Sequence, residues 1–131
     1  MLNIDDEISW MLKVYPHYHL DKPQHMMASV FDKRGSLIGW GVNSYVKTHP
    51  LQARYAAVVN QPARIFLHAE ISALVGAREF VHDLVVVRFN PITKELRHSK
   101  PCLICMEAIF VAGVKRVHFI NKKGVVESHA V

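Results

Sequence analysis

Two short clusters in the chain contain residue types that bind metal ions and move protons. The first is His68-Ala69-Glu70 and the second is Pro101-Cys102-Leu103-Ile104-Cys105. Zinc is bound in proteins by imidazole nitrogens and thiolates, usually in a tetrahedral arrangement. Cys102 and Cys105 are three positions apart, about one helical turn, so both thiols can bind one ion. Two buried thiols or a redox pair are the alternative interpretations of these cysteines.

The two clusters are expected at the starts of two helices that the fold brings together. The chain advances 34 positions from His68 to Cys102, which is room for one helix, one strand and a loop. A helix N-terminus has N–H groups without intrahelical partners and stabilises thiolates. Three protein ligands leave a fourth position for water, which distinguishes a catalytic zinc site from a closed structural one.

Glu70 supplies a carboxylate two residues after His68. Zinc lowers the pKa of a bound water towards about 7. A carboxylate beside that water can take a proton from it and pass the proton to a leaving amine. Attack on an amidine-like ring carbon followed by loss of ammonia requires both of these proton transfers.

The two clusters resemble the zinc deaminase signature H-x-E…P-C-x-x-C of nucleobase deaminases. The resemblance extends to Gly41-Val42-Asn43-Ser44, which is similar to the end of the family's second strand. It also includes the segment from Ala112 to Ile120, which is similar to the helix-to-strand turn after the cysteines. It covers roughly positions 25 to 121.

The resemblance implies a role for each residue that matches the signature. By it, His68, Cys102 and Cys105 bind Zn²⁺, and Glu70 is the catalytic proton shuttle. Residues implied to contact the substrate are Ala69, through its backbone N–H to the base carbonyl, and Asn43, which would touch the base or sugar. The implied fold class is α/β, a three-layer cytidine-deaminase-like fold with a mixed central sheet of about five strands flanked by helices.

Hydrophobic periodicity predicts strands and helices that alternate in the second half of the chain, which favours a layered α/β domain with a mixed sheet. Helices are expected over 4–14, 67–78 and 101–112, with one or two helical turns within 52–59, and Pro101 in the first turn of the last helix. Strands are expected over 25–31, 37–45, 81–89 and 116–120, with a further strand from about 125. Between Pro16 and Pro23 we expect an irregular segment.

Length and composition predict a single domain without a membrane-spanning segment, and the resemblance implies that this is one deaminase domain over residues 1–131. The first ten residues lack the pattern of a signal peptide, so a cytoplasmic protein is expected. The net charge of +5 favours anionic partners. Because the segment from Lys47 to Arg64 joins the Asn43 strand to the His68 helix, we expect it to form the rim of the substrate site. Its candidates for contact with a phosphate are Lys47, His49, Arg54 and Arg64.

The favoured function is a zinc-dependent deaminase of a small cytosine nucleotide, converting dCMP to dUMP. A histidine as the first ligand argues against the free-cytidine deaminases, which usually have cysteine there, and indicates the branch with deoxycytidylate, guanine, riboflavin-pathway, tRNA-adenosine and polynucleotide cytosine deaminases. One alternative is deamination of cytosine or adenine in single-stranded DNA or tRNA, although Lys100 stands before Pro101 where the tRNA enzymes usually have Glu. A second is a non-catalytic protein that keeps zinc for stability. By resemblance we also expect a homo-oligomer.

Overall fold

The computed structural model describes residues 2–15, 25–90 and 92–131, so the irregular segment predicted between Pro16 and Pro23 lies outside the described residues. The helices are α1 (Ile4–Val14), α2 (Pro50–Val58), α3 (Ala69–Val75) and α4 (Leu103–Val111). The strands are β1 (Met26–Phe31), β2 (Leu37–Val42), β3 (Asp83–Phe89), β4 (Leu96–Arg97), β5 (Arg116–Ile120) and β6 (Val126–Ala130).

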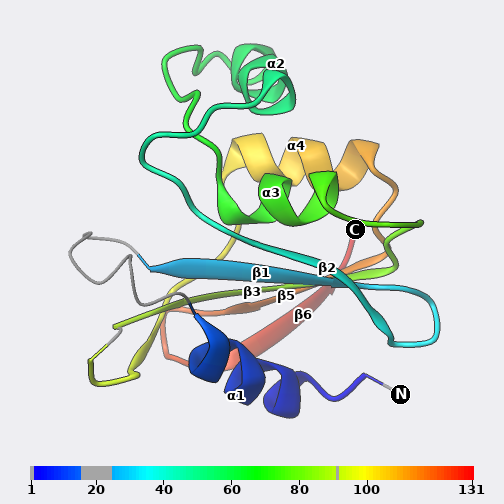
Figure 1. Ribbon diagram of the computed structural model, residues 1–131, viewed down its shortest axis with the longest axis vertical. Helices are drawn as coiled ribbons and strands as arrows, with labels where there is room; N and C mark the ends of the chain where they lie inside the picture. The colour runs from blue at the N-terminus through cyan, green and yellow to red at the C-terminus, as the bar shows by residue number, and fades with distance from the viewer. Residues whose placement is uncertain (1, 16–24, 91) are drawn as a thin grey trace.

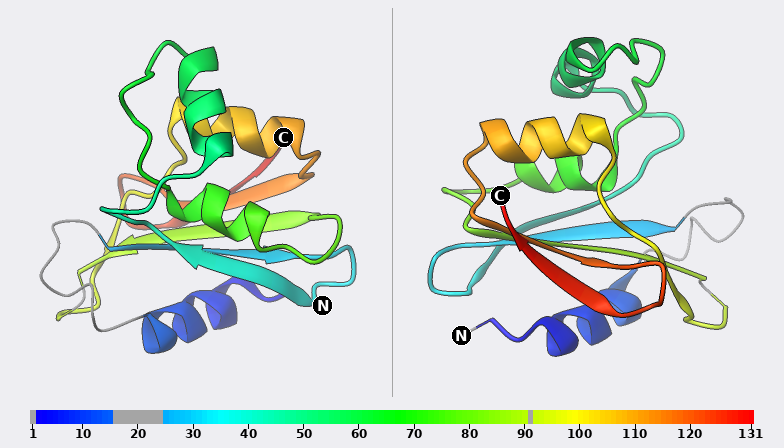
Figure 2. Two further views of the ribbon diagram at one scale, coloured as in Figure 1. Left: turned by 45° about the horizontal axis from the view of Figure 1, so that its top comes forward. Right: turned by 180° about the vertical axis from the view of Figure 1, so that it is seen from behind.

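The strands form one mixed sheet with helices on both faces (Figure 1). The strand order is β2-β1-β3-β5-β6, with β4 paired to β3 off this path. β3 and β5 are parallel, and the other pairs are antiparallel. α1 covers one face of the sheet, α3 and α4 cover the other, and α2 lies beyond α3 and α4 (Figures 1 and 2). This architecture confirms the predicted fold class, with six strands in place of about five.

Three apolar clusters hold these layers together. One lies between the sheet and the α3–α4 layer and includes Val86 and Ile109. The second packs α1 against the opposite face, with Met11 and Phe89 at its centre. The third, around Ile104, joins α2 to the helices beneath it. Burial of β3 on both faces over residues 84–87 agrees with the uninterrupted apolar run Leu84-Val85-Val86-Val87. No helix in the described part of the chain has the length and apolar character needed to cross a bilayer.

Several element boundaries differ from the sequence prediction. α3 is shorter than expected, and the two-residue strand β4 lies between positions 89 and 101, where no strand was expected. Pro101 lies before α4 and not in its first turn, because Cys102 is the N-cap with extended backbone, φ −69° and ψ 172°. Gly113 follows the C-cap Ala112 of α4, at a φ of +77° that a glycine adopts without strain.

Gly41 allows β2 to approach α3 closely, so we expect Gly41→Ala to destabilise the protein. A Cβ at this position would lie 2.5 Å from Ser72 Oγ and 2.7 Å from the backbone nitrogen of Ala73. Overpacking of this kind costs about 1–3 kcal/mol of unfolding free energy, measured by denaturant titration. Gly76→Ala is the control, since its Cβ would meet no atom closer than 3.5 Å. Equal stability of the two variants would contradict this packing.

Asp83 joins β3 to β5 at the other end of the sheet from the two sequence clusters. His118 Nε2 donates to Asp83 Oδ2 over 2.7 Å, and His82 also bonds to this carboxylate. Burial opposes the charge on Asp83, but the hydrogen bonds from His118 and His82 outweigh it and lower its pKa below the ordinary 3.8.

A carboxyl group with a lowered pKa stabilises the fold above its unfolded pKa, and this contribution is lost as the pH falls through its folded pKa. Asp83→Asn should therefore lower the thermal unfolding midpoint at neutral pH, with a difference from wild type that shrinks below about pH 3.8. The exposed Glu95, replaced by glutamine, provides the control. A difference that stays constant down to pH 2 would show that the carboxylate charge is not the stabilising element.

Candidate active site

Two helix starts carry the three residues that were predicted to bind a metal ion. His68 is the N-cap of α3 and Cys102 is the N-cap of α4, and neither side chain caps its own helix. Cys105 lies in the first turn of α4 and is fully buried. The two helices lie side by side on the sheet (Figures 1 and 2). The structure thus brings together clusters that are 34 positions apart in the chain.

His68, Cys102 and Cys105 form a group whose geometry fits a tetrahedral metal ion. His68 Nδ1 lies 3.3 Å from Cys105 Sγ and 3.5 Å from Cys102 Sγ. One ligand atom from each residue lies within 4.8 Å of the other two. Ligand bonds of the lengths found for zinc, about 2.0 Å to nitrogen and 2.3 Å to sulfur, place tetrahedral ligand atoms roughly 3.5–3.8 Å apart. The observed separations are close to this requirement.

The electrostatics of the three side chains also favour metal binding. A hydrogen bond from the Cys105 thiol lowers the pKa of Cys102 to about 4, with help from His68 and against the effect of burial. The same contact with Cys102, together with burial, raises the pKa of Cys105 well above its ordinary value. Cys102 is therefore already a thiolate, the form that binds metal ions. The pKa of His68 is raised by its hydrogen bond to Cys102.

Glu70 lies beside this group at the start of α3, where it is only 2% exposed. Burial raises the pKa of its carboxyl group, and its contacts are its own backbone N–H and the Cys105 side chain. A carboxyl group with a raised pKa gains and loses a proton more readily near neutral pH than an exposed one. Glu70 also lines the pocket in front of the three predicted ligands.

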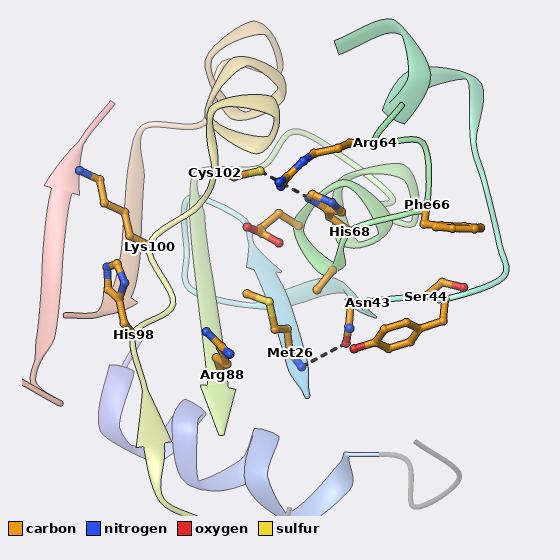
Figure 3. A pocket seen from close by; sticks show the side chains of 13 residues that line it. Met26, Asn43, Ser44, Arg64, Phe66, His68, Arg88, His98, Lys100 and Cys102 are labelled. Atoms are coloured by element: carbon orange, nitrogen blue, oxygen red, sulfur yellow. Dashed lines mark hydrogen bonds between the residues drawn. The ribbon is translucent and has the colours of Figure 1, made fainter. Parts of the chain in front are cut away.

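A pocket of about 410 Å³ opens over these residues (Figure 3). This volume lies within the range of ligand-binding pockets in proteins. Asn43, Ala69 and Arg64 line the pocket, as the sequence led us to expect for substrate contacts. The remaining lining residues were not predicted: Met26, Ser44, Tyr45, Phe66, Arg88, His98 and Lys100. Arg88 and Lys100 had a detectable signal, since one is a charged residue near the end of a buried strand and the other precedes the Pro101-Cys102 cluster.

Lys47 and His49, two of the predicted phosphate contacts, are not among the lining residues. His49 is the N-cap of α2, where its Nδ1 accepts a hydrogen bond from Leu51 N–H over 3.1 Å. Lys47 is exposed on the segment that leads to this helix. Arg54, another of the four candidates, is exposed on α2 and is not among the described lining residues. Arg64 is the one of the four that lines the pocket, and its guanidinium group lies near His68 and Cys102 (Figure 3).

Two amide side chains hold the pocket backbone in place. Asn43 Oδ1 accepts a hydrogen bond from Met26 N–H over 3.1 Å, which fixes Asn43 to the first residue of β1. Gln52, a fully buried residue of α2 that sequence analysis missed, accepts from His68 N–H through Oε1 over 3.1 Å. Its Nε2 donates to the Arg64 carbonyl over 3.3 Å. Gln52 thereby ties α2 to the predicted metal ligand His68.

Comparison with known proteins identifies the fold of this chain. No protein-family model and no curated protein matches the sequence. The structure is similar to the crystal structure of cytidine deaminase from Burkholderia pseudomallei, with a TM-score of 0.56 over 97% of this chain and 89% of that chain. The chain has the cytidine deaminase fold. Sequence identity to that enzyme is 16%, so the fold indicated by the two motifs is confirmed where overall sequence similarity is low.

Proposed function

We propose that the protein is a zinc-dependent hydrolytic deaminase that converts dCMP to dUMP and releases ammonia. The observation that carries the proposal is the placement of Glu70 beside the His68, Cys102 and Cys105 group at one pocket of a cytidine deaminase fold. A metal-ligand group alone is compatible with a structural site, but a buried carboxyl group at its open side is what hydrolysis requires. We propose further that residues 1–131 form a single deaminase domain.

The donor set supports zinc as the metal ion. His68 Nδ1, Cys102 Sγ and Cys105 Sγ would hold it, and nitrogen with two sulfurs is a combination that zinc accepts in catalytic sites. When bound, zinc supplies a Lewis acid that lowers the pKa of water at its fourth position. The protein contributes the electrostatic setting, since one of the two thiols is held as a thiolate by its neighbours.

Glu70 is proposed to move the protons of the reaction. It takes a proton from the attacking water as the oxygen adds to the ring carbon that carries the amine. It passes this proton to the ring nitrogen. It then takes the second proton from the added hydroxyl group and delivers it to the leaving amine, so that ammonia departs and a carbonyl remains. Burial of Glu70 keeps its carboxyl group away from bulk water during these transfers.

Ala69 and Asn43 are proposed to orient the base. The Ala69 N–H lies at the first residue of α3, where helix geometry provides no intrahelical acceptor, so it is placed to donate to a base carbonyl. Asn43 follows β2 and lines the pocket, with its Oδ1 bonded to β1. That bond holds the amide group in one orientation, which suits contact with the base or sugar.

A second candidate function is deamination of a base in single-stranded DNA or tRNA. Cationic residues at the pocket, Arg64, Arg88 and Lys100, favour a phosphate-bearing substrate but do not distinguish a nucleotide from a polymer. A non-catalytic zinc protein is disfavoured because a buried carboxyl group with a raised pKa is costly to keep beside a purely structural site. The homo-oligomer and the cytoplasmic location stay predictions.

A substrate panel tests the proposal. The zinc-loaded protein is incubated with dCMP, deoxycytidine, cytosine, guanine, and oligonucleotides that contain cytosine or adenine, and ammonia is measured. We expect release from dCMP at the highest kcat/KM. Release only from an oligonucleotide would support the second candidate, and release from none would refute deamination of these substrates.

A further inference from the structure

The walls of the pocket differ in charge (Figure 3). On one side lie the uncharged residues Asn43, Ser44 and Phe66. On the other side lie Arg88, His98 and Lys100. Among the described lining residues Glu70 is the sole carboxylate, and it is buried next to the predicted metal ligands. The wall of Arg88, His98 and Lys100, here called the cationic wall, therefore has no acidic residue beside it in the part of the pocket that the structure describes.

Arg88 stands in a row of residues that crosses the sheet at the pocket. It is paired with Met26 of β1 on one side and with Arg97 of β4 on the other. Directly paired residues of antiparallel strands share a face, and like charges in such a pair repel. None of the ion pairs among the described residues involves Arg88 or Arg97. A bound anion would relieve this repulsion.

Ser99 fixes the backbone that carries the other two cations. Ser99 Oγ donates to the Val86 carbonyl over 2.8 Å and accepts from Ile120 N–H over 2.8 Å. Its own N–H donates to the Ile120 carbonyl over 2.9 Å. Because Ser99 is buried between β3 and β5, the residues on either side of it, His98 and Lys100, are left exposed at the pocket. His98 and Lys100 thus lie on a segment that is hydrogen-bonded to β3 and β5 and runs directly to Cys102, while Arg88 lies on β3 itself.

In the described part of the chain, neither Arg88 nor His98 forms an ion pair with an acidic residue. Lys100 also interacts electrostatically with an acidic residue, Glu127 of β6. Hydrogen bonds from His129 and Asn121 lower the pKa of Glu127, and the charge of Lys100 adds a smaller effect. Arg88 is consequently the residue whose replacement tests the wall most cleanly.

We propose that Arg88, His98 and Lys100 form a subsite for the phosphate group of the substrate, so that the pocket prefers a nucleoside monophosphate to a nucleoside. The inference rests on the proposed function, since it assumes that the base lies at Glu70. With the base there, the cationic wall next to Cys102 has charge complementary to a phosphate. Arg64, the other cationic arginine that lines the pocket, lies beside the predicted metal ligand His68 (Figure 3). Arginine binds phosphate oxygens with paired, charge-assisted hydrogen bonds, which makes Arg88 the main anchor.

Binding of the reaction product tests this subsite without requiring turnover. The zinc-loaded full chain is titrated calorimetrically with dUMP and with deoxyuridine, for wild type and Arg88→Gln. Loss of one charge-assisted hydrogen-bonding group should weaken the binding of dUMP on the order of 10-fold or more and leave the affinity for deoxyuridine unchanged. The control is Lys33→Gln, which removes the same charge from the exposed turn between β1 and β2, at the far end of β1 from the pocket. It should alter neither affinity.

Three outcomes would overturn the subsite. They are equal affinity of wild type for dUMP and deoxyuridine, equal weakening of both ligands by Arg88→Gln, and binding of a single-stranded oligonucleotide without binding of dUMP. Ammonia release is measured separately. If Arg88→Gln weakens the binding of dUMP but not of deoxyuridine, and no ammonia is released, the subsite is supported and the proposed deaminase is refuted. If ammonia is released from dCMP and deoxycytidine at equal KM, the deaminase is supported and the subsite is refuted.

Discussion

Replacement of Glu70 by glutamine should abolish ammonia release while the metal ion stays bound. Glutamine has nearly the same shape but cannot carry a proton between water and the leaving amine. Glu70 is not one of the three grouped ligands, and its side chain is buried among them and the pocket. General acid–base groups contribute about 10²–10⁴-fold to a rate, and here one group serves both transfers, so kcat should fall by about 10³-fold or more.

Two measurements accompany this variant. Metal content by atomic absorption should equal that of wild type, and the thermal unfolding midpoint should not fall, because a buried carboxyl group with a raised pKa is replaced by a neutral amide. Glu95→Gln, at an exposed position outside the pocket, is the matched control and should keep full activity. If Glu70→Gln retains activity, Glu70 is not the proton shuttle.

Removal of either cysteine should release the metal ion and thereby abolish the activity. Cys102→Ala and Cys105→Ala each leave two ligands, and two ligands hold zinc far more weakly than three. The unfolding midpoint of the metal-loaded protein should fall in both variants, since a ligand that binds only the folded state stabilises it. The change should be larger for Cys105, which is fully buried, because alanine also leaves a small cavity between α3 and α4.

The response to chelator separates metal loss from simple destabilisation. Wild type should lose activity and thermal stability when zinc is removed and regain both when zinc is added. The cysteine variants should show no response to either treatment. His129→Asn, on the exposed edge strand β6, controls for loss of an unrelated potential ligand and should bind zinc as wild type does. Full zinc occupancy in Cys102→Ala would contradict the predicted ligand set.

Much of the fold was predictable because its signals are local. The apolar run of β3, the bounds of α1 and the glycine after α4 follow from side-chain periodicity and backbone preferences within a few residues. The His68 and Cys102 clusters were recognisable for the same reason, since each needs only residue types at fixed spacing. Their meeting followed from one further assumption, that both begin helices on one side of a sheet.

The remaining parts of the site depend on contacts between distant segments. Gln52 bonds to His68 across 16 positions, and nothing in the local sequence of α2 marks it as a support for the site. Arg88 belongs to the pocket because β1 and β4 pair on either side of it. His49 looked like a phosphate contact from its place in the rim segment, yet its ring caps α2. Charge and position in the chain do not show whether a residue lines the pocket or caps a helix, whereas strand pairing and helix capping do.

Deamination of dCMP in ¹⁸O-labelled water tests the central claim most directly. The zinc-loaded protein is incubated with dCMP, and the product is analysed by mass spectrometry together with the ammonia released. We predict dUMP with a single labelled oxygen and one ammonia for each dUMP formed, and neither product with Glu70→Gln. A folded, zinc-loaded protein that leaves dCMP unchanged, or that forms dUMP without the label, would contradict hydrolysis at this site.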